Sequence, residues 1–230
     1  MPKHFERELE NLKRRILSLG AKVEERLRMA IKAIETRDGT LANQVIKSDH
    51  EIDEMEVDIE EECLKVLALH QPVAIDLRFI IAVIKINNEL ERIGDLAVNI
   101  AERAAFLASQ RKLDILFDFP GMAEKAQSMV KRSLDALVNM DSRLAWEVCA
   151  SDDEVDAMNR DMFIQVQNTM RKKTNRMECL IHLLSASRHL ERVADHATNI
   201  AQDVVYMIEG EIVRHRPETF QALVERGAED

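Results

Sequence analysis

The strongest constraint on the fold is a twelve-residue segment that occurs twice, one hundred positions apart. Residues 90–101 read LERIGDLAVNIA, and residues 190–201 read LERVADHATNIA. In both copies apolar residues recur every three or four positions, as they do on the buried face of an amphipathic helix. A glutamate, an aspartate and an asparagine follow one another at spacings of four, so they form a polar row beside that face. The repeat therefore predicts two equivalent helices, each with an acidic row along its buried face.

The duplication extends well beyond this segment. Residues 48–53 (SDHEID) match residues 151–156 (SDDEVD) at an offset of 103. Helical periodicity runs through six segments, residues 5–36, 41–70, 73–110, 122–140, 144–171 and 175–209. Short turns join them, and Gly210 is expected to cap the last one. The sequence therefore predicts an all-α fold of two tandem, homologous three-helix bundles. Residues 1–112 form the first bundle, and residues 113–230 form the second with a charged C-terminal tail.

Composition agrees with long helices and narrows the function. The 230 residues are 46% hydrophobic but include only 6 glycines, 4 prolines and 4% aromatic residues, which favours helix over sheet. The net charge of −10 would repel a phosphate backbone, so no nucleic-acid partner is expected. The three scattered cysteines predict reduced thiols in a cytoplasmic protein and no thiolate metal site. Neither a signal peptide nor a run of about 20 apolar residues is evident.

Each predicted bundle carries two pairs of acids with a spacing of four, one pair on its second helix and one on its third. Asp53 lies about 19 residues before Pro72 and Glu91 about 19 residues after it, so on antiparallel neighbours both are roughly 28 Å from the turn. Four converging carboxylates need a cation, and oxygen donors suit magnesium, manganese, calcium or iron ions. The predicted metal ligands are Asp49, Asp53, Glu91, Asp95, Asp152, Asp156, Glu191 and Asp195.

Other interpretations of these acids stay open at this point. His50 and His196 lie close enough in sequence to add a nitrogen donor, which would admit zinc or iron. Alternatively, the acids are solvated and pair with arginines, namely Arg92, Arg103, Arg188 and Arg192. A metal-dependent hydrolase or oxidase could use the same carboxylates, and a purely structural scaffold would use none of them. The Glu-x-x-His motif of di-iron bundles does not occur in the sequence, which favours a non-enzymatic protein.

The two Glu-Arg-Ile/Val-x-Asp blocks, the QPVAIDLR turn at residues 71–78 and the closing GEIVRH at residues 210–215 resemble the PhoU family. This resemblance covers essentially the whole chain. It implies multinuclear clusters of divalent or trivalent metal ions (iron, zinc, manganese or magnesium) on the eight carboxylates, and no enzymatic activity. One departure from the repeat is Gly94, where the second copy has Ala194, and it is expected to loosen the first motif helix.

The resemblance also implies a biological role. It is that of a cytoplasmic negative regulator of phosphate uptake and of phosphate-starvation signalling. The implied partners are a phosphate-sensing histidine kinase and the ATPase subunit of a phosphate ABC transporter. The protein would be a homodimer that is peripheral to the membrane through its partners only.

Overall fold

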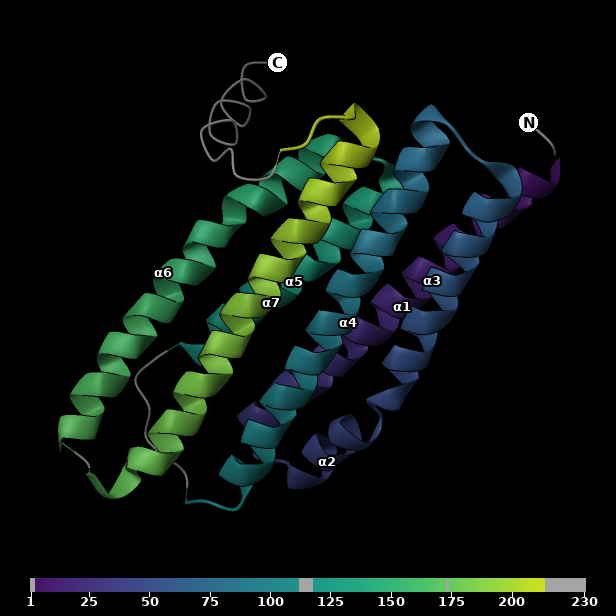
Figure 1. The fold of residues 1–230 in the computed structure, drawn as a ribbon. Coiled ribbons are helices and arrows are strands. Elements are labelled where there is room, and N and C mark those ends of the chain that lie inside the picture. The colour runs from purple at the N-terminus through teal and green to yellow at the C-terminus, as the bar shows by residue number, and fades with distance from the viewer. Residues whose placement is uncertain (1–2, 112–117, 173, 214–230) are drawn as a thin grey trace.

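The computed structural model describes residues 3–111, 118–172 and 174–213, and every regular element within them is a helix (Figure 1). The helices of the first half are α1 (Lys3–Thr36), α2 (Gly39–Lys47), α3 (His50–His70) and α4 (Ala74–Ala108). Those of the second half are α5 (Phe119–Asn139), α6 (Ser142–Lys172), the short 3-10 helix η1 (Thr174–Arg176) and α7 (Met177–Glu209). The prediction of an all-α fold with two tandem three-helix bundles is confirmed.

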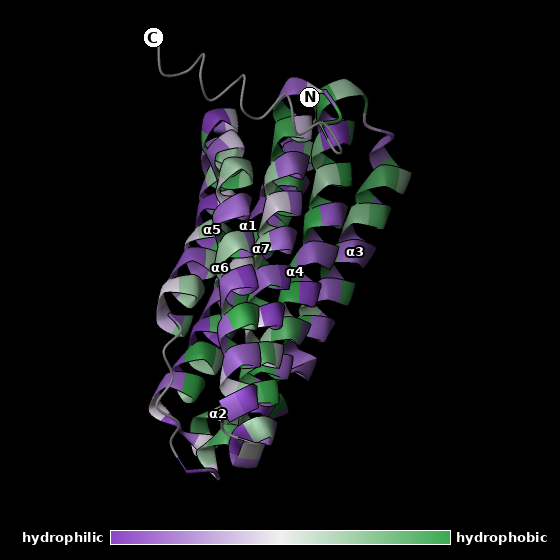
Figure 2. Cartoon of the chain, turned by 90° about the vertical axis from the view of Figure 1, so that its left-hand side faces the viewer, coloured by the Kyte–Doolittle hydropathy of each residue, from purple (hydrophilic) through white to green (hydrophobic). Residues whose placement is uncertain are grey.

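The two halves share one core. α4 and α7 run antiparallel through the middle of the molecule, with α3 and α6 on its outer edges (Figure 1). α4 packs on α1, α2 and α3 of its own half, and α7 packs on α5 and α6, while α4 contacts α7 and α1 contacts α5 across the halves. Figure 2 shows hydrophobic and hydrophilic residues alternating along each helix, as amphipathic helices require. The predicted boundary between residues 112 and 113, and the tail from residue 214 onward, lie outside the described residues.

The apolar stripe of the repeated segment forms part of this shared core. Leu90 and Ile93 on α4, like Leu190 and Val193 on α7, are fully buried. Burying one such side chain contributes about 1.5–3 kcal/mol. The stripe therefore fixes which face of α4 and of α7 points into the core. The polar row beside it must lie at the edge of the core.

The helix ends follow local chemistry. Asp38 caps α2, where its Oδ1 accepts hydrogen bonds from the backbone N–H groups of Thr40 and Leu41 at 2.9 and 3.0 Å. Gly210 ends α7 as predicted, with φ of 79° and its N–H donating to the carbonyl of Tyr206 at 2.9 Å. None of the described helices is long and apolar enough to cross a membrane.

The single helix predicted over residues 41–70 is wrong in one respect, because the structure interrupts it at Ser48 and Asp49. The hydroxyl of Ser48 donates to the carbonyl of Val45 at 2.9 Å, and the backbone N–H of Ser48 donates to the same carbonyl at 3.1 Å. Both bonds reach back three residues, so the regular four-residue ladder stops here and α2 ends before α3 begins.

The second half keeps the equivalent helix intact. The hydroxyl of Ser151 donates to the carbonyl of Glu147, four residues earlier, at 2.8 Å, which is compatible with a continuous α6. The two halves therefore present their first acid differently. Asp49 precedes the first turn of α3, whereas its counterpart Asp152 lies in the interior of α6.

Gly94 has a packing role, and α4 continues through it without a break. It is buried where α4 crosses α3, and a Cβ atom at this position would lie 3.0 Å from Cδ1 and 3.2 Å from Cγ2 of Ile52. Because Gly94 has no side chain, α3 can approach α4 closely at Ile52. Ile52 directly precedes Asp53 on α3, and Gly94 directly precedes Asp95 on α4.

Candidate metal centres

Three carboxylates of the first half converge between α3 and α4. Asp49, Asp53 and Asp95 each offer an oxygen atom that lies within 4.8 Å of the other two. Two oxygens that each lie about 2.4 Å from one ion are at most about 4.8 Å apart, so this spacing fits a calcium-sized cation, and a smaller ion would draw the oxygens closer together. Asp53 and Asp95 are exposed and Asp49 is half-buried, which leaves room for water ligands. The predicted equal heights of the two acidic pairs are confirmed by this contact.

Two glutamates border these three aspartates. Burial raises the pKa of Glu91, and the charges of Asp95, Glu56 and Asp53 raise it further. Burial likewise raises the pKa of Glu56, with added repulsion from Glu60 and Asp53. Glu56 was not predicted, although it lies three residues after Asp53 on the same helical face and the helical period alone could have found it. We call Asp49, Asp53, Glu56, Glu91 and Asp95 the first acidic cluster.

The second half repeats the arrangement with more burial. Burial raises the pKa of Asp152 to about 6, and the charges of Asp195 and Asp156 contribute. Burial and the same aspartates raise the pKa of Glu191, and burial with Asp156 raises that of Asp195. The Oδ1 atom of Asp152 is buried without a hydrogen-bond partner among the described residues. We call Asp152, Asp156, Glu191 and Asp195 the second acidic cluster.

The acids of both clusters fit a bound cation better than they fit the arginine pairing considered above. Among the described residues, only one of the eight predicted ligands forms an ion pair, that of Asp156 with Arg160 at 3.5 Å. Arg92 contacts Glu89 at 3.8 Å, and Arg103 contacts Glu102 at 3.5 Å. Arg92 acts to lower the pKa of Glu91, and Arg188 and Arg192 act to lower that of Glu191, but burial and the neighbouring carboxylates outweigh them. Protein cations therefore compensate the repulsion within each cluster only in part. The buried Oδ1 atom of Asp152 makes no hydrogen bond of normal geometry among the described residues, although the nearby Thr198 hydroxyl acts to lower the pKa of this carboxyl. All donors of both clusters are the hard oxygens that magnesium, manganese or iron accept.

The two histidines considered as extra ligands have different surroundings. His196 Nδ1 donates to Glu89 Oε2 on α4 at 2.6 Å, and Asn199 donates to the same oxygen at 3.2 Å. Burial acts to raise the pKa of Glu89, but these two hydrogen bonds outweigh it and the pKa is lowered. His196 is therefore held by the other half of the molecule. His50 is exposed, and its charge acts to lower the pKa of Asp49, which burial raises.

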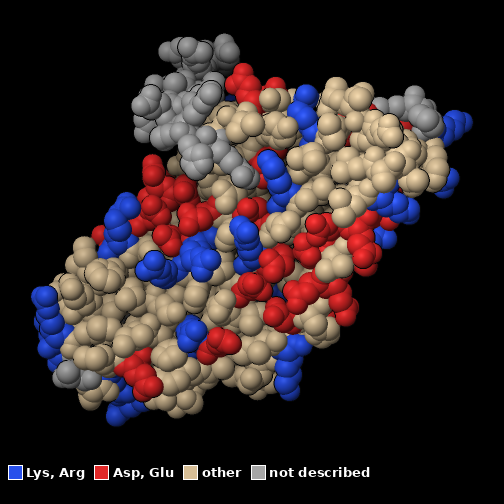
Figure 3. Space-filling view, in the orientation of Figure 1, with Lys and Arg blue, Asp and Glu red and all other residues tan. Residues whose placement is uncertain are grey.

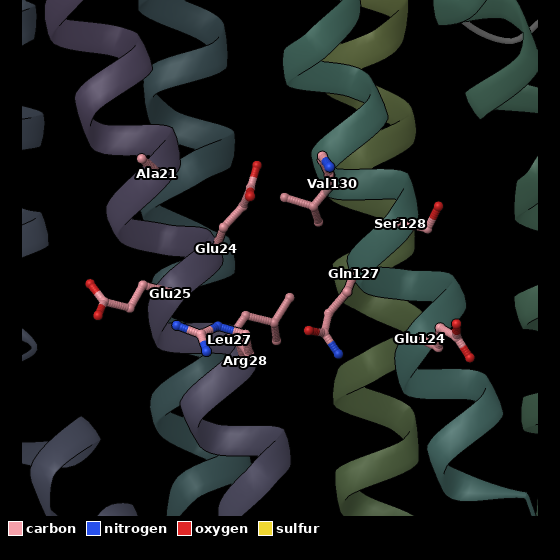
Figure 4. A pocket seen from close by; sticks show the side chains of 10 residues that line it. Ala21, Glu24, Glu25, Leu27, Arg28, Glu124, Gln127, Ser128 and Val130 are labelled. Atoms are coloured by element: carbon pink, nitrogen blue, oxygen red, sulfur yellow. The ribbon is translucent and has the colours of Figure 1, made fainter.

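The clusters lie on the surface and outside the groove between α1 and α5. Figure 3 shows acidic side chains gathered over α3 and, separately, over α6 on the same face. The groove has a volume of about 470 Å³, and Glu24, Leu27 and Val130 point into it (Figure 4). Its lining includes none of the eight predicted ligands. Burial and the charge of Asp135 raise the pKa of Glu24 there.

Comparison with known proteins matches both halves. The family model of the PhoU domain matches residues 16–104 and again residues 119–204. A "phosphate-specific transport system accessory protein PhoU homolog" from Clostridium acetobutylicum is 36% identical over 212 residues, 92% of this chain and 97% of the relative. The Pseudomonas aeruginosa homolog is also 36% identical over 212 residues, 92% of this chain and 88% of the relative.

Solved structures agree with these matches. The crystal structure of PhoU from Pseudomonas aeruginosa superposes with a TM-score of 0.86 at 34% identity, over 90% of this chain and 100% of that one. The phosphate transport system regulatory protein PhoU from Streptococcus pneumoniae gives a TM-score of 0.80 at 29% identity, over 91% and 99%. Fold and sites define a tandem helical-bundle protein with one acidic cluster on each half. The chain belongs to the PhoU family.

Proposed function

We propose that this protein is a cytoplasmic, metal-binding regulator that restrains phosphate uptake and phosphate-starvation signalling. It would act as an adaptor on a phosphate ABC transporter and on the histidine kinase that senses phosphate. The observation that carries this proposal is the pair of equivalent acidic clusters, each at the junction of two helices of a PhoU-family fold. Relatives named as accessory and regulatory proteins of phosphate transport support the biological role.

Metal binding would give the clusters a structural effect. An ion held by Asp53 and Asp95 links α3 to α4, and an ion held by Asp156 and Asp195 links α6 to α7. The first cluster offers five carboxylates, enough donors for more than one ion of six-fold coordination when water completes the shell. Bound ions would also neutralise both acidic surfaces, so they would change the charge that a partner protein meets.

An adaptor fits the sites better than an enzyme does. Ser185 and His189 approach at 3.3 Å on α7, but the Nδ1 atom of His189 is buried without a hydrogen-bond partner among the described residues. A Ser–His pair needs a third group at that nitrogen to orient the base. A hydrolase or oxidase working through the acidic clusters is the second candidate, because exposed metal-bound water can attack a substrate.

The proposal is tested with purified protein and with cells that lack the native gene. Binding of the purified protein to the transporter ATPase and to the kinase is measured with and without manganese, magnesium, iron or zinc. We expect complexes with both partners, and constitutive phosphate-starvation signalling when the gene is absent. Sustained phosphatase or oxidase turnover that disappears in Asp95→Asn would instead favour the enzyme.

Self-association is part of the same proposal. The chain has a mass of 26.4 kDa, so light scattering of a homodimer should give twice that value. A mass of one chain at micromolar concentration, both with metal and in chelator, would contradict it.

A further inference from the structure

Two histidines and a glutamate meet where the start of α1 contacts the end of α3, far from the acidic clusters. His4 and Glu8 lie one turn apart on α1, and His70 is the last residue of α3. Glu8 Oε2 accepts a hydrogen bond from His70 Nε2, and Glu8 Oε1 lies 3.6 Å from His4 Nε2. The carboxylate of Glu8 therefore lies next to two imidazole rings, and each ring approaches it with its Nε2 atom.

The three side chains approach the geometry of a metal site, although their donor atoms do not all lie within 4.8 Å of one another as those of Asp49, Asp53 and Asp95 do. The rings of His4 and His70 are perpendicular, with centroids 6.0 Å apart. Two imidazoles that share a tetrahedral zinc ion at about 2.0–2.1 Å per nitrogen have centroids about 5 Å apart. Glu8 is buried and Phe5 packs on the His70 ring at 4.9 Å between centroids, so two of the three ligands are held in place. The His4 side chain is 78% exposed, so it can rotate to close the remaining distance.

We propose that His4, Glu8 and His70 bind a zinc-class divalent ion, with water in the fourth position. Two imidazole nitrogens and one carboxylate oxygen are a donor set that zinc accepts, unlike the all-oxygen sets of the acidic clusters. The ion takes the place of the proton that now joins His70 to Glu8. It clamps the first turns of α1 to the last turn of α3, beside the turn that leads into α4.

This site is separate from the acidic clusters, and two of its three ligands lie outside the duplicated domain. His70 follows Asp53 by 17 residues along α3, which is roughly 25 Å at about 1.5 Å per residue. His4 and Glu8 precede residue 16, where the family-model match begins. α1 has 34 residues whereas its counterpart α5 has 21, so the second half lacks the turns that carry these two ligands.

The test uses a full-length background protein in which Asp53, Asp95, Asp156 and Asp195 are all replaced by asparagine. Calorimetric titration with zinc should still show one bound equivalent. Cobalt(II), used as a spectroscopic substitute, should show the strong visible absorption of a tetrahedral ion, which an octahedral oxygen site does not give. His4→Gln and His70→Gln, each added to the background, should abolish both signals.

Glu6→Gln is the control, because Glu6 is an exposed acid on α1 that takes no part in this site. It should leave zinc binding intact. His4→Gln keeps the test decisive even if His70→Gln disturbs packing, since the His4 side chain is largely exposed. A background protein that binds no zinc, or zinc affinity unchanged by His4→Gln, would overturn the proposal and leave Glu8 and His70 as a helix–helix hydrogen bond only.

Discussion

Glu89 on α4 and His196 on α7 lie 107 residues apart in sequence, yet the carboxylate accepts a 2.6 Å hydrogen bond from the imidazole. Both side chains are buried at the contact between the two halves. His196 directly follows Asp195 of the second acidic cluster, so one turn of α7 contributes to a candidate metal centre and also contacts the other half. An ion at Asp195 is thus placed one residue from the contact that joins the bundles.

Glu89→Ala should destabilise the protein by about 1–3 kcal/mol, because it leaves the buried His196 and the half-buried Asn199 without their shared acceptor. Urea denaturation at neutral pH measures the loss. Glu102→Ala is the control on the same helix, since Glu102 is exposed and forms only a surface ion pair. Equal effects of the two substitutions would mean that the contact between the halves contributes nothing beyond surface charge.

The raised pKa of Asp152 predicts that the stability of the metal-free protein depends on pH. Its pKa is raised to about 6 from a usual value of 3.8, so the folded state binds this proton more tightly than the unfolded chain does. The resulting stability is fully present below about pH 4 and is lost as the pH rises through about 6. The unfolding free energy of chelator-treated protein should therefore lose this contribution between pH 4 and 6.

Asp152→Asn removes the titrating group and should flatten that part of the profile. Asp161→Asn, at an exposed acid on the same helix, should leave the profile as in the unmodified protein. Added metal should offset the loss at neutral pH, because the ion binds the charged form of the carboxylate. Superimposable profiles for the unmodified protein and Asp152→Asn would contradict the prediction.

Asp95→Asn should stabilise the metal-free protein and weaken its response to metal. Burial and the charge of Asp53 raise the pKa of Asp95, so removing its charge relieves a repulsion on the order of 0.5 kcal/mol. The unmodified protein should gain about 2.7 kcal/mol at a metal concentration one hundred times Kd. Melting temperatures in chelator and in saturating manganese, magnesium or zinc measure both effects.

Asp58→Asn is the control for that comparison, because Asp58 is an exposed acid on α3 outside the first acidic cluster. It should leave the metal response unchanged. A variant Asp95→Asn that is simply less stable, in a protein whose melting temperature ignores every metal, would identify Asp95 as an ordinary surface charge.

Local periodicity explains why much of this architecture could be predicted from the sequence. The heights of Asp53 and Glu91 depend only on the rise per residue and on the position of Pro72. The break at Ser48 could not be predicted, because the equivalent Ser151 is also followed by an aspartate and yet remains helical. The contact between Glu89 and His196 could not be predicted either. A segment that occurs once in each half carries no information about how the two halves pack together. Glu56 was within reach, since it continues the helical face of Asp49 and Asp53.

The central claim is that each half holds its own metal. The most direct measurement is elemental analysis of purified protein after metal loading, for the unmodified chain, for Glu91→Gln with Asp95→Asn, and for Glu191→Gln with Asp195→Asn. We predict that each double variant loses the metal of its own half and keeps that of the other, so that the two losses together account for the carboxylate-bound metal. Unmodified protein without metal at the acidic clusters, or either double variant emptying both, would contradict the account.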